Sequence, residues 1–156
     1  MSVHDDETKF KKAEHDFINE ALANVYDNIL RIEEKELKKS SFSDITVKEV
    51  HLVHAISLHE PKSASQIAKK MHLSRGTLTI NLRNLERKGL INRTKNPHDQ
   101  RVTDITLTKR GRVLYRAHNA FHSKMVDRFL AGFSLDELKV VKHALVNLQD
   151  FLDELT

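Results

Sequence analysis

Cysteine is absent from this sequence of 156 residues, which excludes both a disulfide framework and a metal site built on thiolates. The opening residues, 1–7, are acidic and polar and lack the apolar core of a signal peptide. No uninterrupted apolar run approaches the length that crosses a membrane. These absences lead us to expect a cytoplasmic protein without a membrane partner.

Glycine and proline are scarce, and their distribution divides the sequence. The first 60 residues contain neither, whereas both prolines and three of the four glycines fall between positions 61 and 111. Because these residues interrupt helices, the pattern predicts long helices on either side of a central module rich in turns. We assign residues 1–44 to an N-terminal dimerisation helix, residues 45–109 to the central domain and residues 110–156 to C-terminal dimerisation helices.

Acidic residues are also scarce in the central module. Residues 65–112 hold 12 lysines and arginines against three acids, a net charge of +9, while the rest of the chain carries −5. A basic surface concentrated on one segment is what a protein needs to bind the phosphates of nucleic acid. A solvated basic face is the alternative, and charge alone does not decide between the two.

Long apolar stripes flank the central module. The first runs along a helix expected at about 6–39, and two further helices are expected, one starting near Thr108 and one opening at Ser134. Ser134 and Glu137 have the spacing of a capping box, which supports a helix start there. The stripes on the first and last helices are too long for a small monomer to bury, so we expect a two-fold homodimer.

Two short helices joined by a tight connection begin the central module. The first is expected to start at Ser65. The second follows Ser74, a favourable N-cap residue, and runs to Lys88, where Gly89 suits the left-handed conformation that stops a helix. Two short helices in this arrangement are typical of a helix–turn–helix.

The second of these helices has two different faces. At 100° per residue the leucines at 78, 82 and 85 share one side, and Ile80 and Arg83 point the other way. Arginine reaches guanine edges and phosphates, threonine contacts phosphate or thymine, and glycine allows close approach. An amphipathic surface helix with incidental arginines is the alternative reading of this segment. We predict that the helix reads DNA through Arg75, Gly76, Thr77, Thr79 and Arg83.

A basic hairpin follows the two helices directly. Residues 90–95 and 102–107 have the pattern of strands, joined by a loop that contains Pro97. A helix–turn–helix followed by such a hairpin is a winged helix, which predicts a mainly α-helical fold with a small β-hairpin wing. Arg101 at the tip is suited to enter a minor groove, with Asp99 close enough to orient it. The predicted DNA surface further includes Ser65, Ser74, Lys95, Asp99 and Arg101.

The order of these elements resembles the MarR family of bacterial transcriptional regulators, as do the runs LERKGLI at 85–91 and DQR at 99–101. The resemblance extends from Phe10 to Leu155. Other runs, among them IEE at 32–34 and NLQDFL at 147–152, are similar to the family's repressors of fatty-acid biosynthesis. This resemblance implies a homodimer on a palindromic DNA operator, repression of fatty-acid biosynthesis genes, and long-chain acyl-acyl carrier protein as the corepressor.

Ten histidines are a high number for a chain of this length. His118 and His122 are four residues apart on one predicted helix, a workable spacing for a pair of zinc ligands. The resemblance extends to a zinc-responsive branch of the family that represses metal uptake genes, and it implies His51 and Glu33 as the further ligands. That branch also uses a cysteine, which is absent here. A hydrogen-bonded polar network of the same residues is the alternative, and we favour it, with no metal.

Enzyme activity is not expected. The sequence has no glycine-rich phosphate loop, no nucleophile elbow and no cysteine nucleophile, and it implies no cofactor. A pure dimerisation or scaffold protein would leave the charge of the central module and the hairpin arginine unexplained.

Overall fold

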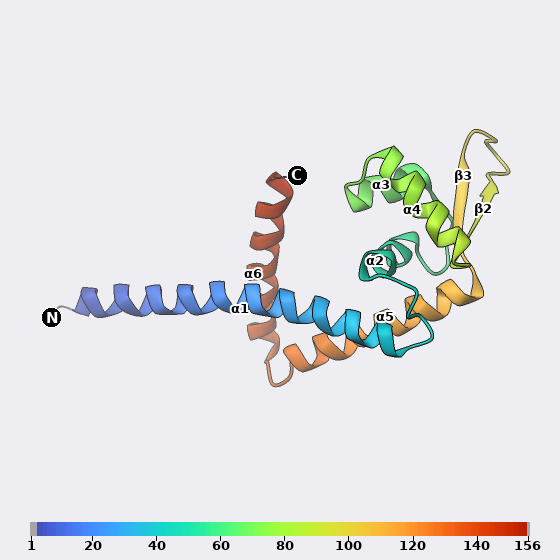
Figure 1. Cartoon of the computed structure of the whole chain (residues 1–156). Coiled ribbons are helices and arrows are strands. Elements are labelled where there is room, and N and C mark those ends of the chain that lie inside the picture. Colours follow the sequence, from blue (N-terminus) through green and yellow to red (C-terminus); the bar gives the residue numbers. More distant parts are fainter. Residues whose placement is uncertain (1–2, 156) are drawn as a thin grey trace. The chain divides into compact units, whose positions relative to one another are not determined.

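The computed structural model describes residues 3–155, with side chains from Lys9 onward. Six helices and three short strands make up this described part (Figure 1). In chain order they are α1 (Val3–Lys39), α2 (Val47–Ile56), β1 (Lys62–Ser63), α3 (Ala64–Met71), α4 (Arg75–Arg87), β2 (Ile91–Lys95), β3 (Thr103–Leu107), α5 (Lys109–Phe129) and α6 (Leu135–Glu154). The predicted mainly α-helical fold with a small β-hairpin wing is confirmed.

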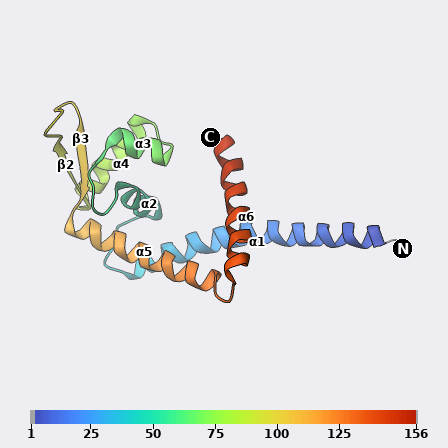
Figure 2. The ribbon, with the colours of Figure 1, turned by 180° about the vertical axis from the view of Figure 1, so that it is seen from behind.

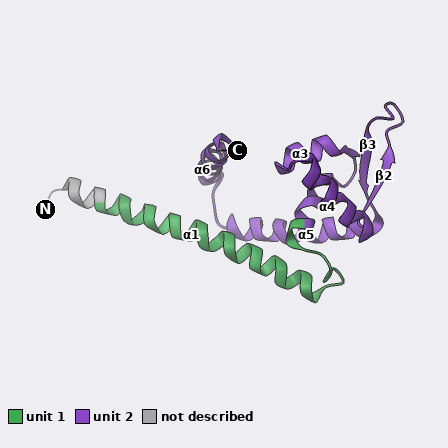
Figure 3. Cartoon of the chain, turned by 45° about the horizontal axis from the view of Figure 1, so that its top comes forward, with its two compact units in different colours: residues 1–48 green, residues 49–156 purple. Residues whose placement is uncertain are grey.

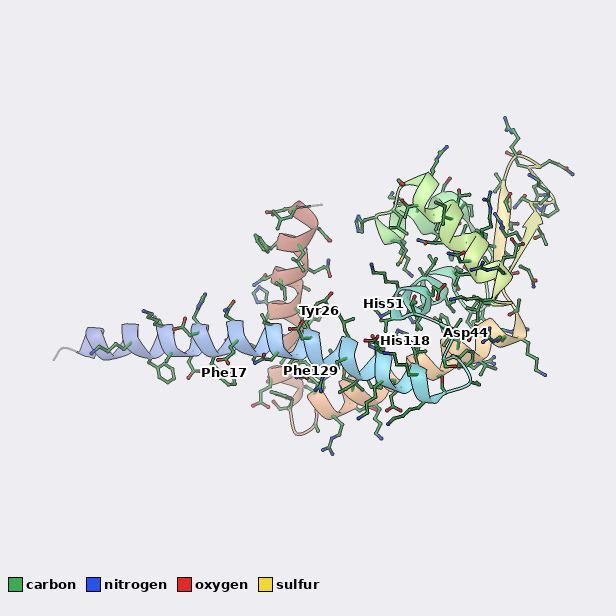
Figure 4. The ribbon with its side chains drawn as sticks, viewed as in Figure 1. Phe17, Tyr26, Asp44, His51, His118 and Phe129 are labelled. Carbon is green, nitrogen blue, oxygen red and sulfur yellow. The ribbon has the colours of Figure 1, made fainter. Side chains whose placement is uncertain are left out.

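The chain divides into two compact units, residues 1–48 and residues 49–156 (Figure 3). The first unit is built on α1, whose predicted apolar stripe is exposed. Phe17 and Tyr26 project from this helix, and Phe17 is 68% exposed (Figure 4). The second unit holds α2 from Glu49 onward, the four helices that follow it and the strands. The division into residues 1–44, 45–109 and 110–156 stays a prediction.

The core of the second unit lies where α2, α3, α4 and the sheet meet at one end of α5 (Figures 1 and 2). Both β1 and β2 pair antiparallel with β3, and Arg93 and Lys62 flank Ile105 in the register. Burial of apolar surface fixes α4 in this core, since three of its leucines are buried. The largest fully buried side chains are those of Ile56, Ile67, Leu78, Leu82, Leu85, Leu90, Ile105 and Val53.

The start of α3 differs from the sequence expectation by one residue. The sequence predicts that the helix begins at Ser65, whereas it begins at Ala64. Its N-cap is Ser63, which forms a capping box with Gln66. The Ser63 hydroxyl accepts from the backbone N–H of Gln66 at 3.2 Å, while the Gln66 side chain accepts from the backbone N–H of Ser63 at 2.9 Å. Ser65 therefore lies exposed within the first turn of the helix.

The last two helices begin as the sequence predicts. Thr108 caps α5, and Ser134 caps α6 in a reciprocal capping box with Glu137. Gly89, at the end of the helix–turn–helix, has a φ of +70°, the left-handed conformation that glycine favours. None of the residues of α6, all of which the structure describes, is buried. No helix in the described chain has both the length and the apolar character of a membrane span.

Candidate nucleic-acid interface

The start of α4 is fixed by side-chain hydrogen bonds. The Ser74 hydroxyl accepts from the backbone N–H of Thr77 at 3.1 Å and donates to the Thr77 hydroxyl at 2.9 Å. One turn on, the Thr79 hydroxyl donates to the backbone carbonyl of Arg75 at 2.8 Å. Ser74 therefore acts as an N-cap, and the Thr79 hydroxyl is turned back along the helix toward the backbone.

The exposed surface of α4 carries the residues predicted to read DNA. Arg75, Gly76, Thr77, Thr79 and Arg83 are all exposed, while the three leucines of the helix are buried. Gly76 has ordinary helical backbone, and a Cβ added to it would meet no atom within 4 Å in the described part of the chain. Packing within the chain therefore gives no reason for a glycine at this position.

The wing presents an arginine held by an acid. Arg101 is 92% exposed, and its Nε and Nη2 donate to the two carboxylate oxygens of Asp99, each at 3.1 Å. Its backbone N–H also donates to Asp99 Oδ1, at 3.0 Å. These hydrogen bonds, first from the side chain and then from the backbone of Arg101, hold the pKa of Asp99 below its usual range. The guanidinium is thus oriented at the tip of the hairpin, as the sequence spacing predicts.

Two ion pairs that the sequence analysis missed hold α4 against its neighbours. Arg93 of β2 donates to Glu86 of α4 at 2.9 and 3.1 Å, which joins the wing to the helix. Lys88, just after α4, lies 2.7 Å from Glu49 of α2, and both side chains are largely buried. Arg110 of α5 donates to the Lys88 carbonyl. No spacing rule links residues 39 positions apart, so only the fold brings Glu49 and Lys88 together.

The predicted DNA-contacting residues all lie in the second unit, on α3, on α4 and in the wing. Lys95 at the end of β2 is exposed, as are Ser65 and Arg83, whereas Asp99 is half-buried. Arg75 and Arg83 on α4, together with Lys95 and Arg101 in the wing, add exposed positive charge to that of Lys69 and Lys70 on α3. Contact of these residues with DNA stays a prediction.

Histidines of α2 and α5 gather at a second place in the same unit. The ring centroid of His118 lies 4.3 Å from that of His122 and 5.4 Å from those of His51 and His54. Figure 4 marks His51 on α2 and His118 on α5. These imidazoles, which come from two helices, include three of the four residues that the alternative zinc-binding interpretation names. Glu33, the fourth, is on α1 in the first unit and is 7% exposed.

His54 is the member of this cluster that the sequence analysis left out. It stacks on Tyr115 with 4.7 Å between ring centroids. Burial, and then the electrostatic effect of Lys70, lower the pKa of His54 below its ordinary value. The cluster therefore favours neutral imidazole at His54, the form that also binds a transition metal.

Comparison with known proteins places these features in a family. The MarR family pattern matches residues 45–103. The structure is similar to that of FabT from Streptococcus pneumoniae in complex with DNA, at 40% identity and a TM-score of 0.82, over 91% of this chain and 99% of that one. The sequence is also similar to two helix–turn–helix proteins of Bacillus subtilis. The repressor MdtR is 25% identical over 118 residues, 76% of each chain. The regulator YhjH is 28% identical over 98 residues, and the match covers 63% of this chain and 56% of YhjH.

Proposed function

The chain belongs to the MarR family of DNA-binding transcriptional regulators, and from that premise we propose that it is a homodimeric repressor of fatty-acid biosynthesis genes. The observation that carries the proposal is the similarity to DNA-bound FabT along 91% of the chain, at 40% identity. The runs at 32–34 and 147–152, which resemble fatty-acid repressors, support the same branch of the family.

In this proposal α4 enters the major groove and the wing reaches a minor groove. The outward face from Gly76 to Arg83 extends about 10 Å along the helix axis, which corresponds to about three base pairs. Arg83 supplies a donor pair for a guanine edge or a phosphate, and the exposed Arg101 supplies a cation for the narrow groove. The largely buried pair of Glu49 and Lys88 keeps α4 in position for both contacts.

The homodimer is supported by apolar side chains that the single chain leaves exposed. Phe17 on α1 and Leu145, Phe151 and Leu152 on α6 are large, apolar and exposed. On α6 these apolar residues recur at helical spacing, and an apolar helix face left in water is typical of an interaction surface. A second copy of the chain covers such surface, and the two-fold axis then places two winged modules on half-sites about 34–36 Å apart.

Long-chain acyl-acyl carrier protein is the proposed corepressor. The support for it is the resemblance of the sequence to the fatty-acid branch of the family. In this scheme the acylated carrier favours the DNA-binding form of the dimer. Abundant long-chain acylated carrier therefore represses the genes for fatty-acid synthesis. Linkage then requires that operator DNA also tighten the binding of the carrier.

A second candidate is a zinc-responsive repressor of metal uptake genes. The contacts among the rings of His51, His118 and His122 favour it, because neutral imidazoles are good zinc ligands. In this alternative, zinc rather than an acylated carrier would raise the affinity for DNA.

A mobility-shift titration separates the two candidates. The full chain is titrated onto a DNA duplex that it selects from a random library, with EDTA, with added zinc, with acylated carrier protein, or with the unacylated carrier. We expect that only the acylated carrier raises the affinity. A zinc-dependent increase that His118→Ala abolishes and His59→Ala, at an exposed position, preserves would overturn the proposal in favour of zinc sensing.

A further inference from the structure

Ile80 is a large apolar residue at the centre of the outward face of α4. At 100° per residue it points almost opposite to the mean direction of the three buried leucines of this helix. Its side chain is 60% exposed, in a helix whose outward face is otherwise polar, small or cationic. Ile80 therefore contributes little to the core that holds α4 in place.

Helix formation gives no reason for an isoleucine at this position. A β-branched side chain loses rotamer freedom in a helix, and alanine, lysine or glutamine would suit an exposed helix position better. Single exposed apolar residues are common on protein surfaces and need no special account by themselves. What distinguishes Ile80 is its neighbours, because Gly76 precedes it by one turn and Arg83 follows it by one turn on the same face.

Gly76 and Ile80 suit each other as parts of a surface that approaches DNA closely. A Cβ at position 76 would meet no atom of the described chain within 4 Å, so its absence leaves the helix backbone open to an outside partner. An isoleucine side chain is much shorter than an arginine side chain, so it reaches the edge of a base only if the backbone comes near. The missing Cβ at position 76 allows that approach.

The major groove offers one apolar group among the edges of the four bases, the 5-methyl group of thymine. Cytosine has a hydrogen at the corresponding carbon, and the purines present nitrogen and oxygen atoms. An apolar side chain in the groove therefore gains free energy by covering a thymine methyl group, and it distinguishes thymine from cytosine without a hydrogen bond.

We propose that Ile80 determines specificity by contacting a thymine 5-methyl group in each half of the operator, with Gly76 permitting the close approach. The inference rests on the placement of α4 in the major groove proposed above. It names a recognition contact in addition to those of Arg75, Thr77, Thr79 and Arg83.

Replacement of single thymines by deoxyuridine tests this contact, because deoxyuridine lacks only the methyl group and keeps every hydrogen bond. The duplex is one that the full-length wild-type protein selects from a random library, and dissociation constants are measured by fluorescence anisotropy at fixed salt. For the wild type we expect one thymine in each half-site whose replacement weakens binding about four-fold, the effect of one buried methyl group. Ile80→Ala should bind the parent duplex more weakly and be insensitive to replacement of that thymine.

Two further variants keep the test decisive. Ile80→Val should retain part of the sensitivity, and it serves if Ile80→Ala binds too weakly to titrate. Val113→Ala, which shortens an exposed apolar residue on α5, is the matched control and should keep the wild-type sensitivity. The inference is wrong if deoxyuridine affects Ile80→Ala and the wild type equally, or affects neither. A wild-type protein that selects no sequence at all would overturn the DNA-binding assignment itself, and with it this inference.

Discussion

At the residue scale, two glycines in the first turns of two helices have opposite surroundings. A Cβ on Gly111, at the start of α5, would lie 2.1 Å from the backbone oxygen of Leu90, so α5 and the base of the wing depend on its absence. A Cβ on Gly76, at the start of α4, would meet nothing within 4 Å in the described chain. Replacement by alanine at position 111 therefore tests whether glycine is needed for packing. Replacement by alanine at position 76 tests whether glycine is needed for DNA binding.

Gly111→Ala should lower the free energy of unfolding by about 1–3 kcal/mol, because the backbone near Leu90 must move. Gly76→Ala should leave that free energy unchanged or raise it by up to about 1 kcal/mol, since alanine favours the helix and fits the space. It should nevertheless weaken operator binding. Urea unfolding and anisotropy titrations of both variants measure these effects. Equal destabilisation by the two substitutions would show that Gly76 also serves packing.

His54 gives the stability of the protein a predictable pH dependence. Its pKa in the folded chain lies below the ordinary value of 6.5, chiefly because of burial and then Lys70. Between the two pKa values the unfolded chain binds more protons than the folded one, so the free energy of unfolding decreases as the pH falls through this window. In EDTA, Tm should therefore fall less between pH 7.5 and 5.5 for His54→Gln than for the wild type. An equal fall in both, with His59→Gln as the control, would contradict this assignment.

At this scale, the sequence predicts the position of a side chain when that position depends only on its own helix or loop. Periodicity placed Arg83 and Gly76 outward and the leucines inward, and a spacing of two residues predicted that Asp99 orients Arg101. It missed the pair of Glu49 and Lys88, and it did not include His54 in the histidine cluster. Those positions depend on how α2 packs against α4 and α5, which no local pattern encodes.

At the element scale, α4 is held by its buried leucines and by ion pairs at its C-terminal end. The pair of Lys88 and Glu49 joins this end to α2, at 2.7 Å, and the pair of Arg93 and Glu86 joins the helix to the wing. Both pairs resist tilting of α4 about its buried face. We expect the direction of the recognition helix to depend on them.

Glu49→Gln should lower the free energy of unfolding by about 1.5–3 kcal/mol, because it leaves the largely buried Lys88 ammonium without its carboxylate. It should also weaken operator binding, because the C-terminal end of α4 is then held less firmly against α2. Glu34→Gln is the matched control, since Glu34 pairs with Lys38 on an exposed helix face. Exposed pairs of this kind contribute about 0.2–1 kcal/mol. Similar losses in the two variants would contradict the role given to Glu49.

The elements themselves were largely predictable from the sequence. The caps at Ser74, Thr108 and Ser134 mark helix starts that the structure has at the next residue. The start of α3 was misplaced because the capping box of Ser63 and Gln66 was overlooked. Strand β1 was missed, since two residues beside a proline show no alternation and pair only because β3 lies next to them.

At the scale of the whole molecule, the exposed apolar residues of α1 and α6 are the basis of the proposed homodimer. Leu145→Glu and Phe151→Glu place a charge on the apolar stripe of α6, both at exposed positions. If this stripe lies between two copies, each variant should sediment as a monomer at concentrations where the wild type is a dimer. His143→Glu, on the other side of α6, should leave the dimer intact.

Monomeric variants should also bind a two-half-site operator far more weakly than the wild type, because the second module no longer benefits from the binding of the first. Sedimentation velocity and anisotropy together measure both effects. A monomeric wild type, or dimers that survive both substitutions on the stripe, would contradict the proposed assembly.

Family membership and fold could be predicted from the sequence. The positive charge of the central module, its glycines and prolines, and the helix with one apolar and one polar face all indicate a winged helix. The homodimer and the effector could not be established in this way, because they depend on surfaces whose partner is a second molecule. An apolar stripe indicates that something covers it, and a histidine cluster indicates coordination or hydrogen bonding. Neither names the partner.

The salt dependence of operator binding tests the central claim most directly. Dissociation constants of the wild type, Arg83→Ala and Arg101→Ala for the selected duplex are measured over a range of salt concentrations. The wild-type affinity should fall steeply and linearly on logarithmic axes, since binding releases counterions from the phosphates. Each arginine substitution should weaken binding by about 1–3 kcal/mol at fixed salt. An affinity that neither salt nor the two substitutions change would contradict the assignment of α4 and the wing as the DNA-reading surface.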